Sequence, residues 1–219
     1  DGPKGRFLAL IVSVKGKTGN GVHLYDPDSG VLRVLDSSSS AYAGLSWRKD
    51  APDLAVFRAK TDDRKEGPAQ VVLAWTGLGA KERSWIYDSA ADAAFPAGKR
   101  IVDFRPISWS AAGDVVFLGL APWEDAVAPA GMKDRAAGPA AAEEVSTIEI
   151  WHARDVFVMP WQKIHADADR RRNTPAALRL SSGKLVPLGL DPAQEEVTPL
   201  RPGRSALVAE WSKYAFNRT

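Results

Sequence analysis

The residues best suited to chemistry in this sequence gather in the stretch 148–172. Trp151 and His152 are adjacent, and Trp161 follows within ten positions. Indole and imidazole groups this close together are typical of ligand-stacking or metal sites. The competing interpretation places His152 at a strand end with local hydrogen bonds. We favour it, because His is commonly a residue of intermediate burial.

Three further metal-ligand types follow at His165, Asp167 and Asp169. Their spacing matches no standard metal site. On a helix, His165 and Asp169 would face the same side and Asp167 would not. We therefore predict a solvated charged face, with neither a metal site nor a cofactor.

A basic run, Arg170-Arg171-Arg172, ends this stretch and would suit a phosphate or an acidic partner. The chain carries 29 basic and 27 acidic residues, a net charge of +2, which favours ordinary surface ion pairs instead. Trp123 is the best candidate for an exposed aromatic residue. The candidate binding or interface residues are thus Trp123, Trp151, His152, Trp161, Arg170 and Arg172.

Composition limits the class of protein. The chain has 219 residues, 45% of them hydrophobic, which is enough to bury a core as one domain. It has no Cys, which excludes disulfides, thiol catalysis and cysteine metal sites. The balanced charge argues against nucleic acid and anionic membranes as partners, and no apolar run approaches the roughly 18 residues of a membrane span. The start, 1–6, has neither Met nor a signal-peptide core, so we interpret the chain as a piece of a longer protein.

The N-terminal third alternates between apolar runs and turn residues. Phe7–Val14 predicts a buried strand, and Val22–Tyr25 predicts its hairpin partner. The turn Asp26–Gly30 then leads to a third strand at Val31–Leu35. Such short strands separated by turn signals indicate an all-β fold.

A repeat runs through the chain. Leu45-Ser46-Trp47 precedes a strand at 54–57, and Ile107-Ser108-Trp109 precedes one at 115–119. A weaker copy begins at Val197 and precedes a strand at 206–209. Repeats of this kind are typical of propeller blades, and we expect Trp47 and Trp109 to pack between blades.

We therefore predict one all-β domain over residues 1–219, a partial β-propeller of about three to four blades of four-stranded antiparallel sheet. The blade units are approximately 1–40, 41–98, 99–190 and an incomplete 191–219. In the third unit we expect Thr147–His152 to form the third strand and 176–188 to close the blade. Pro160–Asn173 would be a short helix or an irregular hairpin tip, and about 125–144 would be a mobile loop rich in Ala, Pro and Gly.

A longer gapped motif resembles a known family. It consists of Glu149-Ile150-Trp151-His152, Asp155, Met159, Gln162-Lys163, Asp169-Arg170, Arg172-Asn173 and the run 183–189. This pattern resembles the N-terminal propeller region of a bacterial branch of the prolyl oligopeptidase family of serine peptidases. The units around Trp47 and Trp109 are similar to TolB-like repeats. The chain departs from the family pattern at Ala153, where an aromatic is usual, and at Trp161.

The resemblance implies a parent serine peptidase with a C-terminal α/β-hydrolase domain. The nucleophile elbow Gly-x-Ser-x-Gly of that domain is absent from these 219 residues. The three histidines, His23, His152 and His165, all precede any segment that could be a hydrolase. The resemblance therefore implies a chain without catalytic residues, which gates the access of peptides to the hydrolase domain. It is compatible with a parent exported to the periplasm, and the sequence leaves the compartment open.

Two alternatives stay open at this point. The chain would be a stand-alone TolB-like propeller acting as a protein-interaction scaffold, or a propeller that binds carbohydrate or a small ligand through its aromatic residues. A truncated propeller also has unpaired edges, so we expect self-association of the chain.

Overall fold

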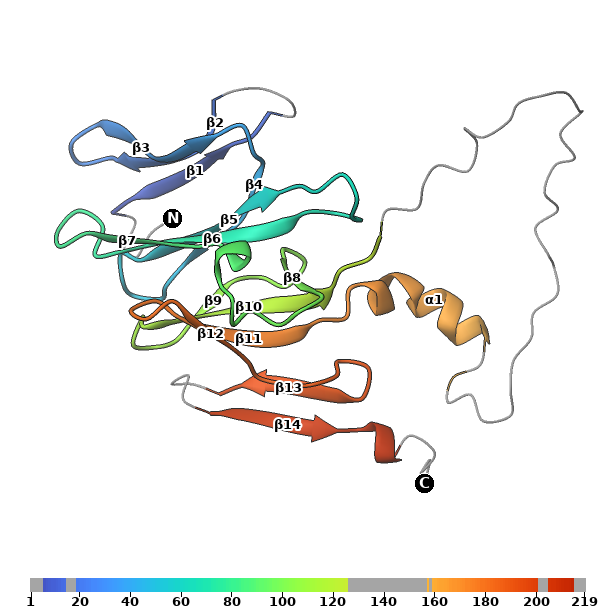
Figure 1. The fold of residues 1–219 in the computed structure, drawn as a ribbon. Helices are drawn as coiled ribbons and strands as arrows, with labels where there is room; N and C mark the ends of the chain where they lie inside the picture. The colour runs from blue at the N-terminus through green and yellow to red at the C-terminus, as the bar shows by residue number, and fades with distance from the viewer. Residues whose placement is uncertain (1–5, 15–18, 126–156, 158, 201–204, 215–219) are drawn as a thin grey trace, which may run out of the picture.

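The computed structural model describes residues 6–14, 19–125, 157, 159–200 and 205–214. Four antiparallel sheets follow one another along the chain and stack face to face (Figure 1). The all-β prediction is confirmed, and the arrangement is that of a partial propeller whose ring is not closed.

The strands of each sheet follow one another along the chain, joined mostly by short turns. The first sheet has the order β1-β2-β3 (Leu8–Val12, Asn20–Asp26, Val31–Ser38). The second has the order β4-β5-β6-β7 (Tyr42–Trp47, Leu54–Lys60, Ala69–Thr76, Arg83–Tyr87). The third has the order β12-β11-β10-β8 (Lys184–Pro187, Thr174–Arg179, Val115–Pro122, Lys99–Val102), with β9 (Ser108–Trp109) also paired to β10. The fourth consists of β13 (Glu195–Pro199) and β14 (Ala206–Glu210) in the described part of the chain.

The repeat seen in the sequence is a repeat of strand register. Trp47 pairs with Leu54, Trp109 with Val116 and Pro199 with Ala206, and the separation along the chain is the same in each pair. The strand pairs β4-β5, β9-β10 and β13-β14 are therefore copies of one unit. Trp109 also donates its indole Nε1–H to the Ser46 carbonyl at 3.2 Å, which confirms that it packs between sheets.

The prediction for the third sheet is wrong in one element. β10 pairs with β8 and β9 on one side and with β11 on the other, so β11 is the third strand. Thr147–His152, expected in that position, lie outside the described residues, as does most of the loop expected at 125–144. A strand-like alternation alone does not give a strand its place in a sheet, because pairing depends on register against the neighbouring strand, here β10.

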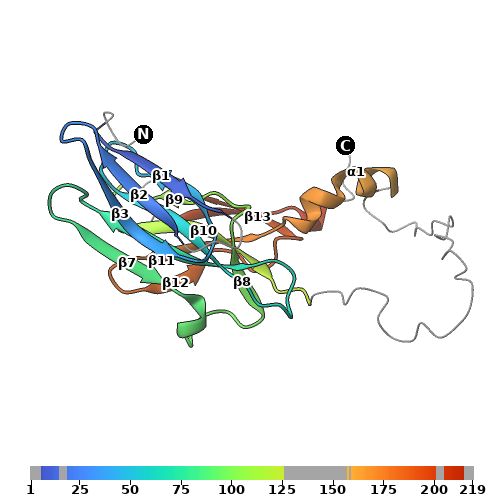
Figure 2. The same ribbon diagram turned by 90° about the horizontal axis from the view of Figure 1, so that it is seen from above.

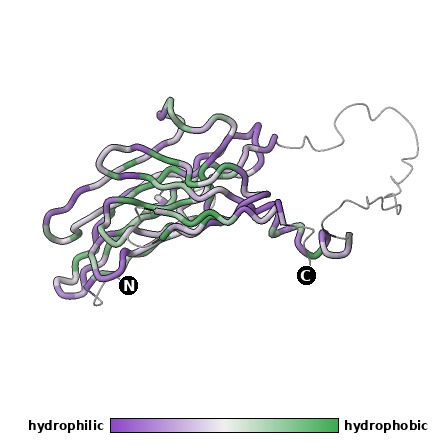
Figure 3. The backbone as a smooth tube through the Cα atoms, turned by 90° about the horizontal axis from the view of Figure 1, so that it is seen from below, coloured by the Kyte–Doolittle hydropathy of each residue, from purple (hydrophilic) through white to green (hydrophobic). Residues whose placement is uncertain are grey.

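The two central strands of the second sheet, β5 and β6, each contribute to two cores. On β5, Leu54 and Val56 face the first sheet, whereas Ala55 and Phe57 face the third. Since successive side chains of a strand point to opposite faces, a sheet covered on both faces must be apolar throughout. This explains the uninterrupted apolar run 71–75 of β6, and Figure 3 shows the hydrophobic segments inside the stack.

The outer face of the first sheet is apolar and exposed. Leu10 and Val34, each paired with His23 of β2, are 49% and 56% exposed. Leu32 is 56% exposed on the same face. Self-association through such a face stays a prediction.

The segment that could have been a helix or an irregular tip is a helix. α1 spans Met159–Arg170, and Pro160 stands in its first turn, where its missing N–H costs no hydrogen bond. Figure 2 shows that α1 projects beyond one end of the strands. Two single-turn 3₁₀ helices, η2 (Ser89–Ala91) and η3 (Ser212–Tyr214), complete the elements described. Within the described ranges, no helix is long and apolar enough to cross a membrane.

Candidate functional site

The structure separates the candidate residues into two places. Trp161 and Arg170 lie on α1, and Arg172 follows its last turn, whereas Trp123 follows β10. Trp151 and His152 lie outside the described residues. The structure therefore does not show how all six candidate residues lie relative to one another.

Trp123 packs against residues at the start of β8 and just before it. Its ring lies over the Arg100 guanidinium at 5.3 Å, and its backbone N–H donates to the Gly98 carbonyl at 2.8 Å. It borders a hollow of about 730 Å³ together with Phe95 and the ion pair of Lys60 and Asp88. The charges of that hollow are largely paired, so it offers no specific chemistry.

An aromatic stack runs along α1. Phe157, Trp161 and His165 are spaced by four residues, and neighbouring rings are stacked with centroids 3.8 Å apart. Trp211, just after β14, contacts Phe157 with a centroid distance of 6.3 Å. Trp161 therefore packs within the chain and ties α1 to the fourth sheet. In the described ranges, no group of three His, Asp or Glu residues could hold a metal ion.

The basic run forms local ion pairs, as the balanced charge of the chain predicts. Arg170 lies 3.4 Å from Asp167, and Arg172 lies 2.7 Å from Asp169. Both pairs are spaced by three residues, and the Arg170 pair is almost fully exposed, so it contributes little to stability.

Below the C-terminal end of α1 lies a cavity of about 500 Å³ between the third and fourth sheets, which we call the α1 cavity. It brings Arg172 next to residues that the sequence analysis did not select. The most notable are Arg105, from the segment between β8 and β9, and Asn173 and Thr174, where β11 begins.

Arg105 is the functional candidate that the sequence analysis missed. Its guanidinium donates to Asn173 Oδ1 at 3.2 Å, and burial lowers the pKa of this Arg. No carboxylate among the described residues pairs with it. One signal could have found it: Gly119 interrupts the apolar run of β10, and a glycine inside a strand often marks the close approach of another group. A Cβ at Gly119 would lie 2.7 Å from the Cβ of Arg105.

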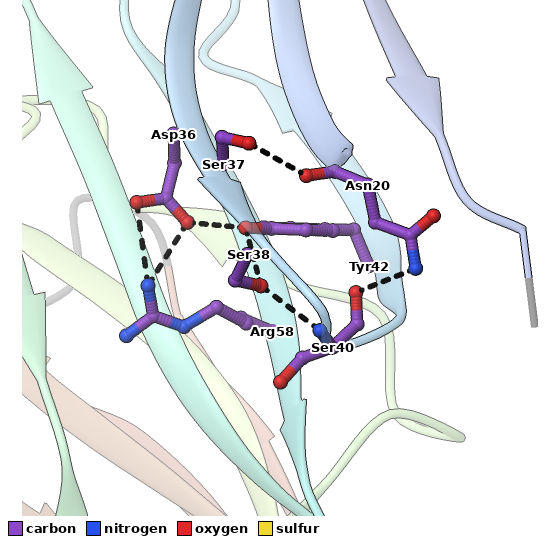
Figure 4. A network of polar contacts seen from close by, with 7 residues as sticks. All are labelled: Asn20, Asp36, Ser37, Ser38, Ser40, Tyr42 and Arg58. Carbon is purple, nitrogen blue, oxygen red and sulfur yellow. Dashed lines mark hydrogen bonds and ion pairs between the residues drawn. The ribbon is translucent and has the colours of Figure 1, made fainter. Parts of the chain in front are cut away.

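A second polar cluster joins the first and second sheets (Figure 4). The Tyr42 hydroxyl donates to Asp36 at 2.5 Å and lies 2.9 Å from the Ser38 hydroxyl, and Arg58 lies 3.0 Å from the same carboxylate. Asn20, 3% exposed, donates to the Ser40 carbonyl at 3.1 Å. The Asp36 carboxylate accepts from both the Tyr42 hydroxyl and Arg58, and the Ser38 hydroxyl is bonded to Tyr42 as well. The cluster fastens the two sheets together, and it has no catalytic arrangement.

This cluster and Tyr87 lead to a prediction about alkaline stability. Burial, followed by the hydrogen bond to Asp36, raises the pKa of Tyr42; burial and the hydrogen bond to Asp92 raise the pKa of Tyr87. Above about pH 10 an unfolded Tyr loses its proton while the folded one keeps it, so the folded state binds more protons. The stabilisation that these two groups provide is therefore fully present below about pH 10 and is lost as the pH rises further.

Urea unfolding between pH 7 and pH 11 measures this effect. The contribution of these two groups to the free energy of unfolding should be constant from pH 7 to 9 and fall above about pH 10. The double variant Tyr42→Phe/Tyr87→Phe should be less stable at pH 8 and have a flatter profile above pH 10. An unchanged alkaline slope in that variant would show that other groups cause the loss.

Comparison with known proteins adds no identity. No protein-family model matches the chain, and no curated protein matches it significantly. The site must therefore be interpreted from its geometry.

Proposed function

We propose that the chain is the non-catalytic propeller part of a prolyl oligopeptidase-like serine peptidase, which controls the access of peptides to a hydrolase domain. The observation that carries the proposal is the open stack of blade-like sheets with one register repeated in three of them. The gapped motif from Glu149 to Gly189 supports it by resemblance to that family.

The exposed apolar face of the first sheet supports a role inside a larger assembly. Leu10, Leu32 and Val34 form a patch that a further sheet or domain would cover. In a propeller each blade packs on the next, so this face has the character of a blade interface. A stack of this kind provides a rigid wall that excludes folded proteins by size and admits short peptides.

The test follows the reading frame past Thr219 and expresses the longest chain that it encodes. We expect a Gly-x-Ser-x-Gly segment downstream, labelling of that serine by a fluorophosphonate probe, and loss of the label in its Ser→Ala variant. The 219-residue chain alone is the control and should not be labelled. The longer chain should cleave chromogenic prolyl or aminoacyl peptides much faster than the same sequence inside a folded protein.

A scaffold function is the alternative, because the same exposed face could bind a partner protein. A reading frame that stops at Thr219 would favour it and would contradict the peptidase proposal. Turnover of peptides by the 219-residue chain, sensitive to a serine-directed inhibitor, would contradict both proposals.

A further inference from the structure

We propose that the free edge of β1 is a docking site for one extended peptide strand that carries the apolar-Ser-Trp unit. Such a strand would extend the first sheet through main-chain hydrogen bonds, as in other cases of β-strand addition. The occupant is thus a further copy of the repeat that runs through this chain. The proposal goes beyond the proposed function, because it does not depend on a hydrolase domain.

β1 corresponds to the second strand of the other sheets. Its residues Leu8-Ala9-Leu10-Ile11 match the types of Leu54-Ala55-Val56-Phe57 in β5, position by position. The hairpin that follows, β2-β3, turns at Gly30 with a φ of +70°, and the β11-β12 hairpin turns at Gly183 with a φ of +64°. β1, β2 and β3 are therefore the second, third and fourth strands of a blade.

The strands equivalent to β1 have a neighbour on the side where β1 has none among the described residues. β5 is paired with β4, β10 with β9 and β14 with β13. β1 is paired with β2 alone in the described part of the chain. An added strand would therefore form the same ladder that the other three sheets already contain.

β1 also lacks the features by which edge strands avoid pairing. Natural edge strands carry charges, prolines or bulges, or are very short. The other edge strands of the described sheets have at least one such feature: Arg33 on β3, a register irregularity in β4, Arg83 on β7, Lys99 on β8, a length of two residues in β9, Lys184 on β12, Glu195 on β13 and Glu210 on β14. The β1 sequence, Leu8–Val12, has no charge and no proline, and its pairing with β2 is regular.

The register of the repeat indicates how the docked strand lies. Trp47 is opposite Leu54 of β5, and Leu54 corresponds to Leu8 of β1. The Trp of the docked strand would therefore lie opposite Leu8, in one row with Tyr25 and Leu32 on the outer face of the sheet. This row is apolar and uncharged, and pairs of aromatic and aliphatic side chains across strands stabilise antiparallel sheets.

Fluorescence anisotropy of a labelled peptide tests the proposal. The probe has the sequence of residues 41–48, which includes Leu45-Ser46-Trp47, and should bind the 219-residue chain saturably. The peptide variant Leu45→Pro/Ser46→Pro should bind at least about tenfold more weakly. N–H groups of adjacent residues point to opposite edges of a strand, so one of the two prolines removes a ladder hydrogen bond whichever edge pairs. The peptide variant Trp47→Ala should bind about fivefold more weakly.

Two variants of the chain separate the edge of the first sheet from its face. Leu10→Lys places a charge in the middle of β1 and should weaken peptide binding at least about tenfold. Leu32→Lys is the matched control, because Leu32 lies on the same face but on β3, and its binding should equal that of the wild type. The two leucines are 49% and 56% exposed, so both variants should fold. In hydrogen exchange, the peptide should protect amides of β1 and leave those of β3 unchanged.

Several results would overturn the proposal. They are the absence of peptide binding, wild-type affinity in Leu10→Lys, and equal losses in Leu10→Lys and Leu32→Lys, which would place the peptide on the face of the sheet. Equal binding of the probe and its Trp47→Ala variant would show that the edge does not select the repeat unit. A dimer that Leu10→Lys converts to a monomer, and that does not bind the peptide, would make a second copy of the chain the occupant.

Discussion

Replacing Phe57 with Ala lowers the free energy of unfolding by about 3–5 kcal/mol, because a large buried ring is lost and a cavity is left in its place. Phe57 is fully buried and belongs to the core between the second and third sheets. Its ring lies against Gly44, where a Cβ would approach the ring Cδ2 to 2.8 Å. Gly44 has a φ of +67°, which glycine adopts without steric cost, and the absence of a Cβ there lets the ring pack directly against the backbone.

Thermal and urea unfolding measure the loss. For a chain of this length a loss of this size corresponds to a fall in Tm of very roughly 6–20 °C. Ile86→Ala is the matched control, because Ile86 lies on β7 of the same sheet and is 66% exposed. It should change stability by less than about 0.5 kcal/mol. A similar loss in both variants would mean that the core between these sheets is not packed as described.

Replacing Asp53 with Ala lowers the free energy of unfolding by about 2–3 kcal/mol, because the charge-assisted hydrogen bonds of a buried carboxylate are lost. The Asp53 carboxylate accepts from Arg48 Nε at 2.6 Å and from the Gly77 N–H at 2.8 Å. Its side chain is only 5% exposed, and that of Arg48 is 23% exposed. Arg48 also donates to the Ala111 carbonyl at 3.0 Å, so the carboxylate positions a contact with the third sheet.

Variants separate the charge from the hydrogen bonds. Asp53→Asn retains an acceptor for Gly77 and loses the ion pair, so its effect should lie between those of wild type and Asp53→Ala. Asp62→Ala is the control, because Asp62 pairs only with an Arg64 side chain that is 86% exposed. A double-mutant cycle with Arg48→Ala measures the coupling, and additive effects would show that the pair is not the cause.

The repeat and the hairpins could be predicted from the sequence because they depend on local residues. The turn Asp26–Gly30 and the glycine at Gly183, with a φ of +64°, mark strand connections whatever the rest of the chain does. In each copy, the Trp of the apolar-Ser-Trp unit lies at the same separation from the residue with which it pairs. The copies at Trp47 and Trp109 can therefore be recognised although they are far apart in the sequence.

The third strand of the third sheet and the α1 cavity could not be predicted in this way. Both depend on contacts between residues far apart in the sequence. Leu178 is paired with Val116 across a long insertion, and Arg105, between β8 and β9, meets Asn173, which directly precedes β11. The basic run suggested Arg170 and Arg172 by composition alone, whereas the half-buried Arg is a single residue in a segment with no charge pattern.

The long connection between β10 and β11 also bears on the order in which the sheets form. β10 ends at Pro122 and β11 begins at Thr174, whereas β5 and β6 are joined through the short segment from Lys60 to Ala69. Closing the longer loop costs roughly 1–2 kcal/mol more chain entropy. The chain loses this entropy before the burial of Ala176 and Leu178, both fully buried in the folded state, can offset the loss. We therefore expect the second sheet to form early and to serve as the surface on which the third sheet closes late.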